Sequence, residues 1–390
     1  MTRVHDAVIV GGGLVGASLA LALQRGGLDV ALIEPQALQS PPPAESWDSR
    51  IYAVSPGNAE FLRELGVWGR LDARRMQRVE TMAIFGDQSA GRLDFSAYDA
   101  GLRELAWIVE SGALQRALAA AIAEAGGVSM HCPAQAATLQ RADACARVLL
   151  ADGAAVAAQL VIGTDGRESW VRHAAGIAAQ VSAYDQIGVV ANFETDKPHG
   201  AQALQWFRDD GVLALLPLPG NRVSMVWSTA ESHARGLLAL DAQALADTVA
   251  AASGEMPGAL RSLTPAAGFP LHLARVARLI APRVALAGDA AHHVHPLAGQ
   301  GVNLGFRDAR TLAAVLAGRA PRQDCGEMSL LRRYERARAE DIAATGLSAD
   351  ALQKLFGARA VWVGGVRNFG LGLVNRLPFL KNRLIQHAIA

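Results

Sequence analysis

Cysteine is scarce in this chain, and the few cysteines present form no recognisable site. The 390 residues include three, Cys132, Cys145 and Cys325. They are isolated, odd in number, and show neither a CxxC pair nor a metal-ligand spacing. This usage indicates buried or incidental thiols in a reducing compartment and gives no support to structural zinc.

The chain also lacks an excess of either charge and any long apolar helix. Lys and Arg number 37 against 36 Asp and Glu, a formal net charge of +1, which argues against a nucleic-acid partner. The uncharged run 7–23 resembles a signal peptide, but Asp6 stands where a positive charge is expected and glycines interrupt the run. No other stretch approaches the roughly 20 apolar residues of a membrane helix. We therefore expect a cytoplasmic protein of two domains or one composite domain.

What the sequence does contain is a glycine-rich turn between an apolar strand and a helix. The strand is Ala7–Val10, and Gly11, Gly13 and Gly16 follow in the GxGxxG spacing. Gly11 permits the tight turn, Gly13 lets the backbone approach a pyrophosphate, and Gly16 lets helix and strand pack closely. The phosphates would then meet the positive end of the helix.

An acidic residue completes this fingerprint. A second apolar strand, Val30–Ile33, ends at Glu34, which is about 20 residues downstream, the distance expected of a carboxylate that bonds ribose hydroxyls. Strand, glycines, helix and acid together predict a bound dinucleotide.

A second ligand-binding pattern lies near the other end of the chain. The apolar run Val284–Ala287 breaks at Gly288-Asp289, and a His-rich turn leads into a helix expected from about Gly299. A carboxylate at a strand end, followed by a glycine-rich helix start, suits a polyol joined to an electron-rich ring. Asp165-Gly166 follows another apolar strand and predicts a third contact to the same long ligand.

The histidines of that turn invite a metal interpretation. His292, His293 and His295 lie close to Asp289 in the sequence. Metal sites usually draw their ligands from separated positions, so we expect no metal. For His295, two roles stay open: proton transfer near the ligand, or a structural role at the helix entry.

The middle of the chain carries short apolar runs separated by turns. Strand candidates are Ala203–Arg208, Val212–Leu216 and Arg222–Ser228, which predict an antiparallel meander. Thr81–Phe85 and Arg92–Phe95 are expected to join the same sheet. Near the C-terminus, Arg332–Glu340 reads as a solvated charged helix face.

These segments together resemble the single-component flavin-dependent aromatic hydroxylases, and within them the ubiquinone-biosynthesis ring hydroxylases. The most specific match is His-Pro-Leu-Ala-Gly-Gln-Gly-Val-Asn-Leu-Gly at 295–305, followed by Asp308. The supporting matches are Asp48–Ala53, Leu114–Leu118, Leu215–Leu218 and Val226-Trp227. The similarity covers nearly the whole chain.

The resemblance implies an α/β fold: a doubly wound, Rossmann-like FAD-binding domain, an inserted antiparallel-sheet substrate domain, and C-terminal helices. The FAD-binding domain is expected at residues 1–75, 105–178 and 279–365. The substrate domain is expected at 76–104 and 179–278, and an amphipathic tail at 366–390.

The resemblance also implies roles for individual residues. FAD would be held by Gly11, Gly13, Gly16, Glu34, Gln115, Asp165, Gly288, Asp289, Gly299, Gln300, Gly301 and Asn303. Among these, the glycines near the N-terminus and Glu34 would bind the ADP half, and Asp289 the ribityl chain. The catalytic positions would be His295, Pro296 beside the flavin ring, and Arg50 on the loop that covers it.

The implied reaction is hydroxylation of a prenylated phenol or quinone precursor of ubiquinone with O2. The chain has no second GxGxxG, so NAD(P)H is expected to bind transiently as a co-substrate. Two alternatives remain: a flavin hydroxylase of a soluble aromatic compound, and a non-catalytic flavin-binding subunit of a biosynthetic complex.

The basic, amphipathic tail supports three interpretations. It could rest on an anionic membrane surface, pack on the core, or contact a subunit or another ubiquinone-biosynthesis protein. A lipid-tailed substrate favours the first of these. The expected location is then cytoplasmic, peripheral on the inner membrane face.

Overall fold

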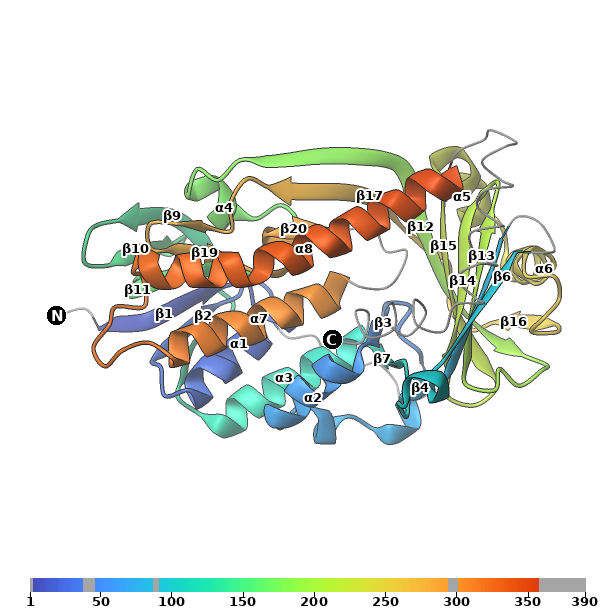
Figure 1. Ribbon diagram of the computed structural model, residues 1–390, viewed down its shortest axis with the longest axis horizontal. Coiled ribbons are helices and arrows are strands. Elements are labelled where there is room, and N and C mark those ends of the chain that lie inside the picture. The colour runs from blue at the N-terminus through green and yellow to red at the C-terminus, as the bar shows by residue number, and fades with distance from the viewer. Residues whose placement is uncertain (1–2, 38–45, 87–90, 294–300, 358–390) are drawn as a thin grey trace.

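Three sheets organise the part of the chain that the computed structural model describes, residues 3–37, 46–86, 91–293 and 301–357 (Figure 1). The first sheet carries the glycine fingerprint. The second forms the opposite end of the molecule, and a small third sheet lies between them. Within the described residues, no helix is both long enough and apolar enough to cross a membrane.

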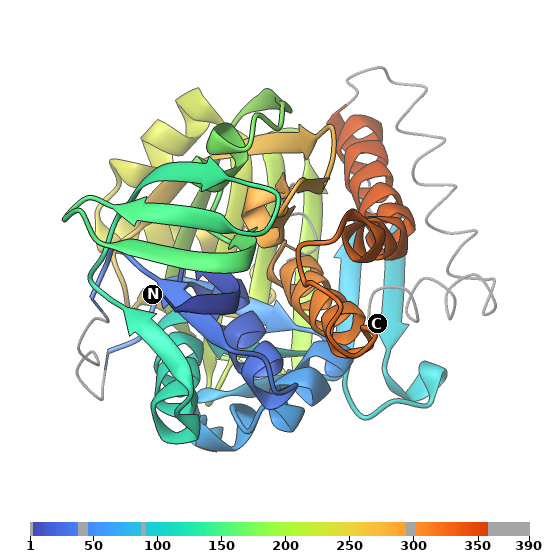
Figure 2. The same cartoon turned by 90° about the vertical axis from the view of Figure 1, so that its left-hand side faces the viewer.

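The first sheet has a parallel centre, and Figure 2 views the molecule from the end that carries it. Its parallel strands are β1 (Val4–Val10), β2 (Val30–Ile33), β8 (Val128–His131), β11 (Ala155–Gly163) and β19 (Val284–Leu286). Antiparallel strands at its margins are β9 (Ala136–Arg141), β10 (Ala146–Leu150) and β18 (Ile280–Ala281). The central parts of these strands, residues 7–10, 30–33, 160–162 and 284–286, are apolar and buried, as expected of a parallel sheet covered on both faces. Each fully buried Val, Leu or Ile contributes roughly 1.5–3 kcal/mol.

Helices from distant parts of the chain cover this sheet. They are α1 (Leu14–Arg25), α2 (Pro56–Glu64), α3 (Ser111–Ala125), α4 (Trp170–Ala174), α7 (Gly301–Ala317) and α8 (Met328–Gly357). Helix α1 packs against both α3 and α7, and α8 packs along α7 (Figure 1). The C-terminal helix α8 is therefore part of the support of the first sheet.

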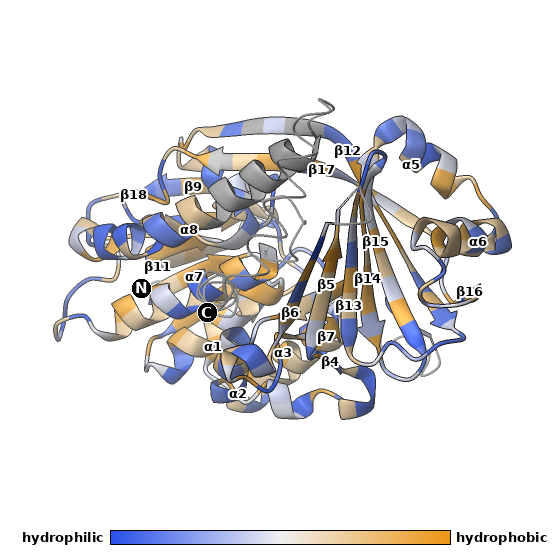
Figure 3. Ribbon diagram, turned by 45° about the vertical axis from the view of Figure 1, so that its right-hand side comes forward, coloured by the Kyte–Doolittle hydropathy of each residue, from blue (hydrophilic) through white to orange (hydrophobic). Residues whose placement is uncertain are grey.

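The second sheet presents one face to α5 (Glu231–Leu238) and α6 (Ala242–Ala252) and the other toward the first sheet (Figure 3). Its strands are β5 (Thr81–Phe85), β6 (Arg92–Ser96), β12 (Ala179–Thr195), β13 (Gln202–Arg208), β14 (Gly211–Leu218), β15 (Arg222–Ala230), β16 (Leu260–Ser262), β17 (Ala267–Val276) and β20 (His292–His293). The predicted meander is confirmed in β13, β14 and β15, which pair antiparallel. Strands β5 and β13 pair parallel. The long chain between them passes through the first sheet, which provides the crossover that parallel neighbours need.

The third sheet joins β3 (Ile51–Val54), β7 (Ala106–Glu110) and β4 (Gln77–Val79). Its buried residues Val79 and Ile108 pack with Ala203 and Leu218 of the second sheet. The first sheet draws strands from residues 4–33, 128–163 and 280–286, and the second from 81–96, 179–276 and 292–293. The domain bounds given above remain a prediction.

The expectation that Arg332–Glu340 is a solvated face is correct for most of these residues but wrong for two of them. Tyr334 and Arg338 lie one turn apart on the inner side of α8 and are buried, whereas Arg332 and Arg336 are exposed. The pattern failed because the buried arginine meets carboxylates inside the protein, which charge counting along a helix does not reveal.

Candidate functional site

The three fingerprint glycines differ in what surrounds them. Gly11 has a φ of +103°, and a Cβ there would lie 2.6 Å from the carbonyl oxygen of Thr164. A Cβ on Gly16 would lie 1.9 Å from the carbonyl oxygen of Gly11. A Cβ on Gly13 would meet no described atom within 4 Å. Gly11 and Gly16 are therefore required by packing, whereas Gly13 borders open space.

That open space lies at the N-terminus of α1. Gly13 is the N-cap residue, and no side chain of the described residues caps this end. The first N–H groups of the helix therefore point toward a place that a phosphate can fill. We call Gly11, Gly13 and Gly16 the glycine cradle; it fits the pyrophosphate of a dinucleotide.

Glu34 lies directly beside the cradle at the end of β2. Its Oε2 accepts a hydrogen bond from the Gly12 backbone N–H at 2.6 Å, and its Oε1 accepts one from the Gln36 N–H at 2.9 Å. Both contacts are to backbone, so the carboxylate is held at the edge of the fingerprint turn.

The Asp165 segment also contacts the cradle. Thr164 donates from Oγ1 to the carbonyl oxygens of Val10 and Gly11, at 3.0 and 2.8 Å. Asp165 accepts from the Ser169 hydroxyl at 2.5 Å and from the Val171 N–H at 2.9 Å. Its carboxylate therefore stabilises the start of α4, and the adjacent Thr164 fastens this loop to the fingerprint.

The second ligand-binding pattern forms a single helical turn, Gly288–Ala290, after β19; we call it the Gly288 turn. Gly288 has a φ of +62°, a region that favours glycine, and lies against the side chain of Val15 in α1. The Gly288 N–H donates to the buried carboxylate of Asp308, on α7, at 2.8 Å. The turn thus lies close to the helix that begins at the cradle.

Tyr52, for which no sequence motif predicted a role, lies together with Arg50 and Asp289. Burial raises the pKa of the Tyr52 hydroxyl; Arg50 acts against that shift and the carboxylate of Asp289 adds to it. The Arg50 guanidinium lies 5.6 Å from the centre of the Tyr52 ring. The sequence feature that could have pointed to Tyr52 is its position two residues after Arg50. In an extended chain such as the one entering β3, this spacing places both side chains on the same side.

The loop that carries Arg50 is fixed at several points. The Asp48 carboxylate accepts from the Arg50 N–H at 2.8 Å and from the Gly112 N–H at 3.0 Å. The side-chain amide of Asn192, on β12, donates to the Asp48 carbonyl oxygen at 3.0 Å. This bond ties the second sheet to the Arg50 loop, a link that the sequence did not reveal.

The remaining predicted residues fall in three groups. Gln115 is exposed on α3, and Gly301 begins α7. Asn303 donates to the Ala53 carbonyl oxygen at 2.8 Å and accepts from the Ser55 N–H at 2.9 Å, so it joins α7 to the segment after β3. The predicted residues that lie outside the described ranges are His295, Pro296, Gly299 and Gln300.

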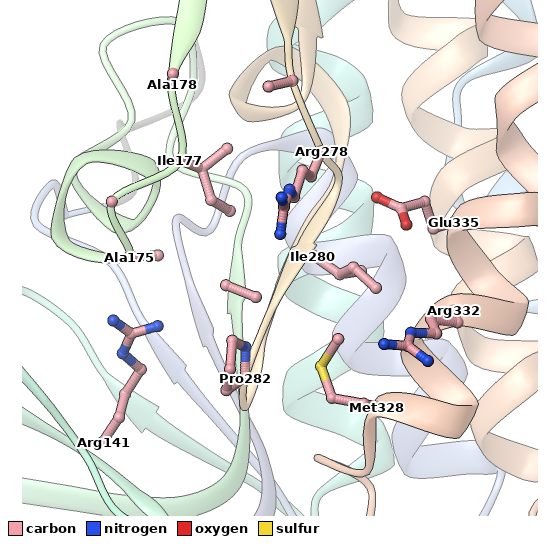
Figure 4. A pocket seen from close by; sticks show the side chains of 13 residues that line it. Arg141, Ala175, Ile177, Ala178, Arg278, Ile280, Pro282, Met328, Arg332 and Glu335 are labelled. Atoms are coloured by element: carbon pink, nitrogen blue, oxygen red, sulfur yellow. The ribbon is translucent and has the colours of Figure 1, made fainter.

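Neither a metal site nor the cavity found in the structure coincides with these residues in the described part of the chain. In the described part of the chain, no group of three or more His, Cys, Asp or Glu side chains is arranged to hold a metal ion. A cavity of about 790 Å³ lies around β18 beside α8 (Figure 4). Arg141, Arg278 and Arg332 are among its lining residues, but none of the predicted site residues is.

Comparisons with known proteins identify the family of this chain. The model of the FAD binding domain family matches residues 4–346. The ubiquinone hydroxylase UbiL of Rhodospirillum rubrum is 34% identical over 99% of this chain and 90% of its own length. The 3-demethoxyubiquinol 3-hydroxylase of Escherichia coli is 34% identical over 98% of both chains. The human ubiquinone biosynthesis monooxygenase COQ6 is 31% identical over 99% of this chain and 92% of its own length.

The chain belongs to the family of FAD-dependent ubiquinone-biosynthesis hydroxylases. It is accordingly an FAD-dependent aromatic monooxygenase, as the resemblance implied. Solved structures share its fold. The p-nitrophenol 4-monooxygenase PnpA of Pseudomonas putida has a TM-score of 0.81 at 18% identity, covering 100% of this chain and 99% of that one. Klebsiella pneumoniae HpxO, complexed with FAD and uric acid, has a TM-score of 0.74 at 20% identity, covering 98% of this chain and 96% of that one.

Proposed function

We propose that this hydroxylase acts on the aromatic ring of a polyprenylated phenol, a precursor of ubiquinone, with O2 and NAD(P)H as co-substrates. The observation that carries the proposal is the match of 98–99% of the chain to three hydroxylases named for ubiquinone biosynthesis. FAD, when bound, would supply the redox chemistry by which NAD(P)H and O2 are consumed, with one oxygen atom added to the ring and the other released as water.

The ADP half of FAD is assigned to the glycine cradle and Glu34. Open space at Gly13 and the uncapped start of α1 within the described residues support this assignment. The ribityl chain is assigned to Asp289 of the Gly288 turn, and the pyrimidine edge of the ring to the start of α7 at Gly301. A helix N-terminus favours the negative charge of a reduced flavin.

Other predicted residues are assigned supporting roles. Asn303 positions the start of α7 through its bonds to the segment after β3. Asp165 shapes the loop against the cradle. Gln115 and Arg50 approach the cofactor from α3 and from the loop before β3. The Tyr52 hydroxyl is protonated at neutral pH, as for an ordinary tyrosine, and burial moves its pKa further up, so it can donate a hydrogen bond.

The substrate ring is assigned to the face of the second sheet opposite α5 and α6. Val190, Val226 and Ala214 lie in register across β12, β15 and β14 and would border the ring on this face. Asn192 and Ser224 form the next paired row. Their buried oxygens Oδ1 and Oγ have no hydrogen-bond partner among the described residues; a phenol hydroxyl would be able to donate to Asn192 Oδ1 and accept from the Ser224 hydroxyl.

Contact with an anionic membrane surface, or with other ubiquinone-biosynthesis proteins, is proposed for residues 366–390 from their composition alone. They lie outside the described residues. Flotation of full-length protein with anionic and neutral liposomes tests the membrane arm, and binding only to the anionic set is the expected result.

Isotope labelling tests the reaction. The FAD-loaded protein is given NAD(P)H, 18O-enriched O2 and a prenylphenol, and the product is analysed by mass spectrometry. We expect one added oxygen atom labelled from O2, and less hydrogen peroxide per NAD(P)H once the substrate excludes water from the site. Label from water would overturn the proposal. Efficient turnover of small phenols without any response to the prenyl chain would instead favour a soluble substrate. Bound FAD without substrate-stimulated NAD(P)H oxidation would favour a non-catalytic subunit.

A further inference from the structure

A wholly buried carboxylate holds the Gly288 turn. Besides the Gly288 N–H, Oδ2 of Asp308 accepts a hydrogen bond from Nε2 of His292 at 2.6 Å, and Oδ1 accepts one from Nε of Arg338 at 2.7 Å. Burial alone would raise the pKa of Asp308, but His292 and Arg338 outweigh it and hold the pKa below its usual value. The group beneath the turn is therefore an ionised acid with three donors.

Arg338 reaches this acid from α8. Its side chain is 4% exposed, and its Nη1 donates to Asp341 at 2.6 Å. One turn earlier on the same helix, the buried Tyr334 hydroxyl donates to the carbonyl oxygen of Leu286 at 2.8 Å. Helix α8 thus contacts both the last residue of β19 and the carboxylate beneath the turn that follows.

We propose that Arg338 is a positioning residue for the flavin. It acts through Asp308, whose ionised carboxylate fixes the Gly288 N–H and so sets the direction of Asp289. A buried carboxylate without a cation is costly and tends to take up a proton or move toward water. Without Arg338, the Gly288 turn would lose its fixed geometry. The proposal rests on the assignment of Asp289 to the ribityl chain.

Arg307 provides a matched control. It lies on α7, is 7% exposed at its side chain, and donates to the other oxygen of Asp341 at 2.7 Å. No hydrogen bond from Arg307 to Asp308 is found among the described residues. Each arginine can be replaced by lysine, which keeps the charge but lacks the planar fork that lets Arg338 contact Asp308 and Asp341 together.

The experiment titrates FAD into FAD-stripped wild type, Arg338→Lys and Arg307→Lys, and records thermal unfolding of each apoprotein. We expect Arg338→Lys to raise the Kd for FAD about tenfold, which corresponds to a loss of about 1.4 kcal/mol in binding free energy. Arg307→Lys should stay within about twofold of wild type. The visible circular dichroism of bound flavin should change only in Arg338→Lys. Equal loss of FAD affinity in both variants would mean general destabilisation and overturn the proposal.

A double-mutant cycle tests whether the effect passes through Asp308. In an Asp308→Asn background, Arg338→Lys should weaken FAD binding by no more than about twofold further, whereas additive losses contradict the proposal. If Arg338→Lys does not fold, the single variant Asp308→Asn tests the proposal. An Asp308→Asn protein that binds FAD as tightly as wild type would also overturn it. All titrations omit aromatic substrate, so they stand apart from the test of the proposed reaction.

Discussion

The glycine cradle and the Gly288 turn are built in different ways. The glycines of the cradle and Glu34 lie within residues 11–34, and the shape of the cradle comes mainly from backbone and from the absence of side chains, with the Thr164 loop packed against Gly11. The Gly288 turn is held by charged side chains from two packed helices: Asp308 on α7 bonds the turn, and Arg338 on α8 bonds Asp308. One region is fixed by a short sequence pattern, and the other by packing between elements.

This difference predicts different responses to mutation. In the cradle, a substitution either collides with backbone or fills the place of the ligand. At the Gly288 turn, a substitution removes a charge or hydrogen bond from a buried network. Substitutions in the two regions separate these responses, from the largest expected effect to the smallest.

Gly16→Ala should cause the largest loss of stability, because its Cβ would lie 1.9 Å from the Gly11 carbonyl oxygen. We expect a loss of about 3 kcal/mol or more, at the upper end for overpacking. Gly13→Ala is the control: its Cβ meets open space, so the cost should stay within about 1 kcal/mol, the range for an N-cap change. Chemical unfolding of the two apoproteins measures this, and equal losses would contradict the account of the cradle.

Acid should weaken the protein through Asp308. Because the pKa of this residue is depressed in the folded state, its contribution is present above the unfolded pKa of about 3.9 and is lost as pH falls through the folded pKa. Between about pH 6 and pH 2, wild type should lose more stability than Asp308→Asn, by up to about 2.6 kcal/mol, the limit set by about 1.36 kcal/mol per pKa unit between about 3.9 and pH 2. Parallel stability curves for the two proteins would show that Asp308 is not held as an ion.

Tyr52→Phe should have the smallest effect. It removes a hydroxyl that interacts with Ser111 and Arg50 but keeps the buried ring. The expected cost is about 0.5–1.5 kcal/mol, hence a few-fold weaker binding of FAD. Fluorescence titration measures it; a loss as large as that of Asp289→Ala would give Tyr52 a direct contact with the flavin.

The sequence predicted the local region well, because strand, glycines, helix and Glu34 are contiguous and each has its own physical requirement. The strands β13, β14 and β15 of the second sheet could be predicted for the same reason, because short apolar runs alternate there with turn residues. The support of the Gly288 turn could not be predicted: Arg338 resembles its exposed neighbours, and only the packing of α8 reveals its burial. The bond from Asn192 to the Arg50 loop likewise joins residues 144 positions apart.

Binding of ADP to the FAD-stripped protein tests the division between the two regions most directly. Calorimetry compares ADP and FAD on wild type, Gly13→Val and Asp289→Ala. Gly13→Val should abolish measurable binding of both ligands, because its side chain fills the pyrophosphate position. Asp289→Ala should raise the Kd for FAD about tenfold to a hundredfold and leave that for ADP within about twofold. An Asp289→Ala protein that loses ADP as strongly as FAD, or a Gly13→Val protein that binds both normally, would contradict the account.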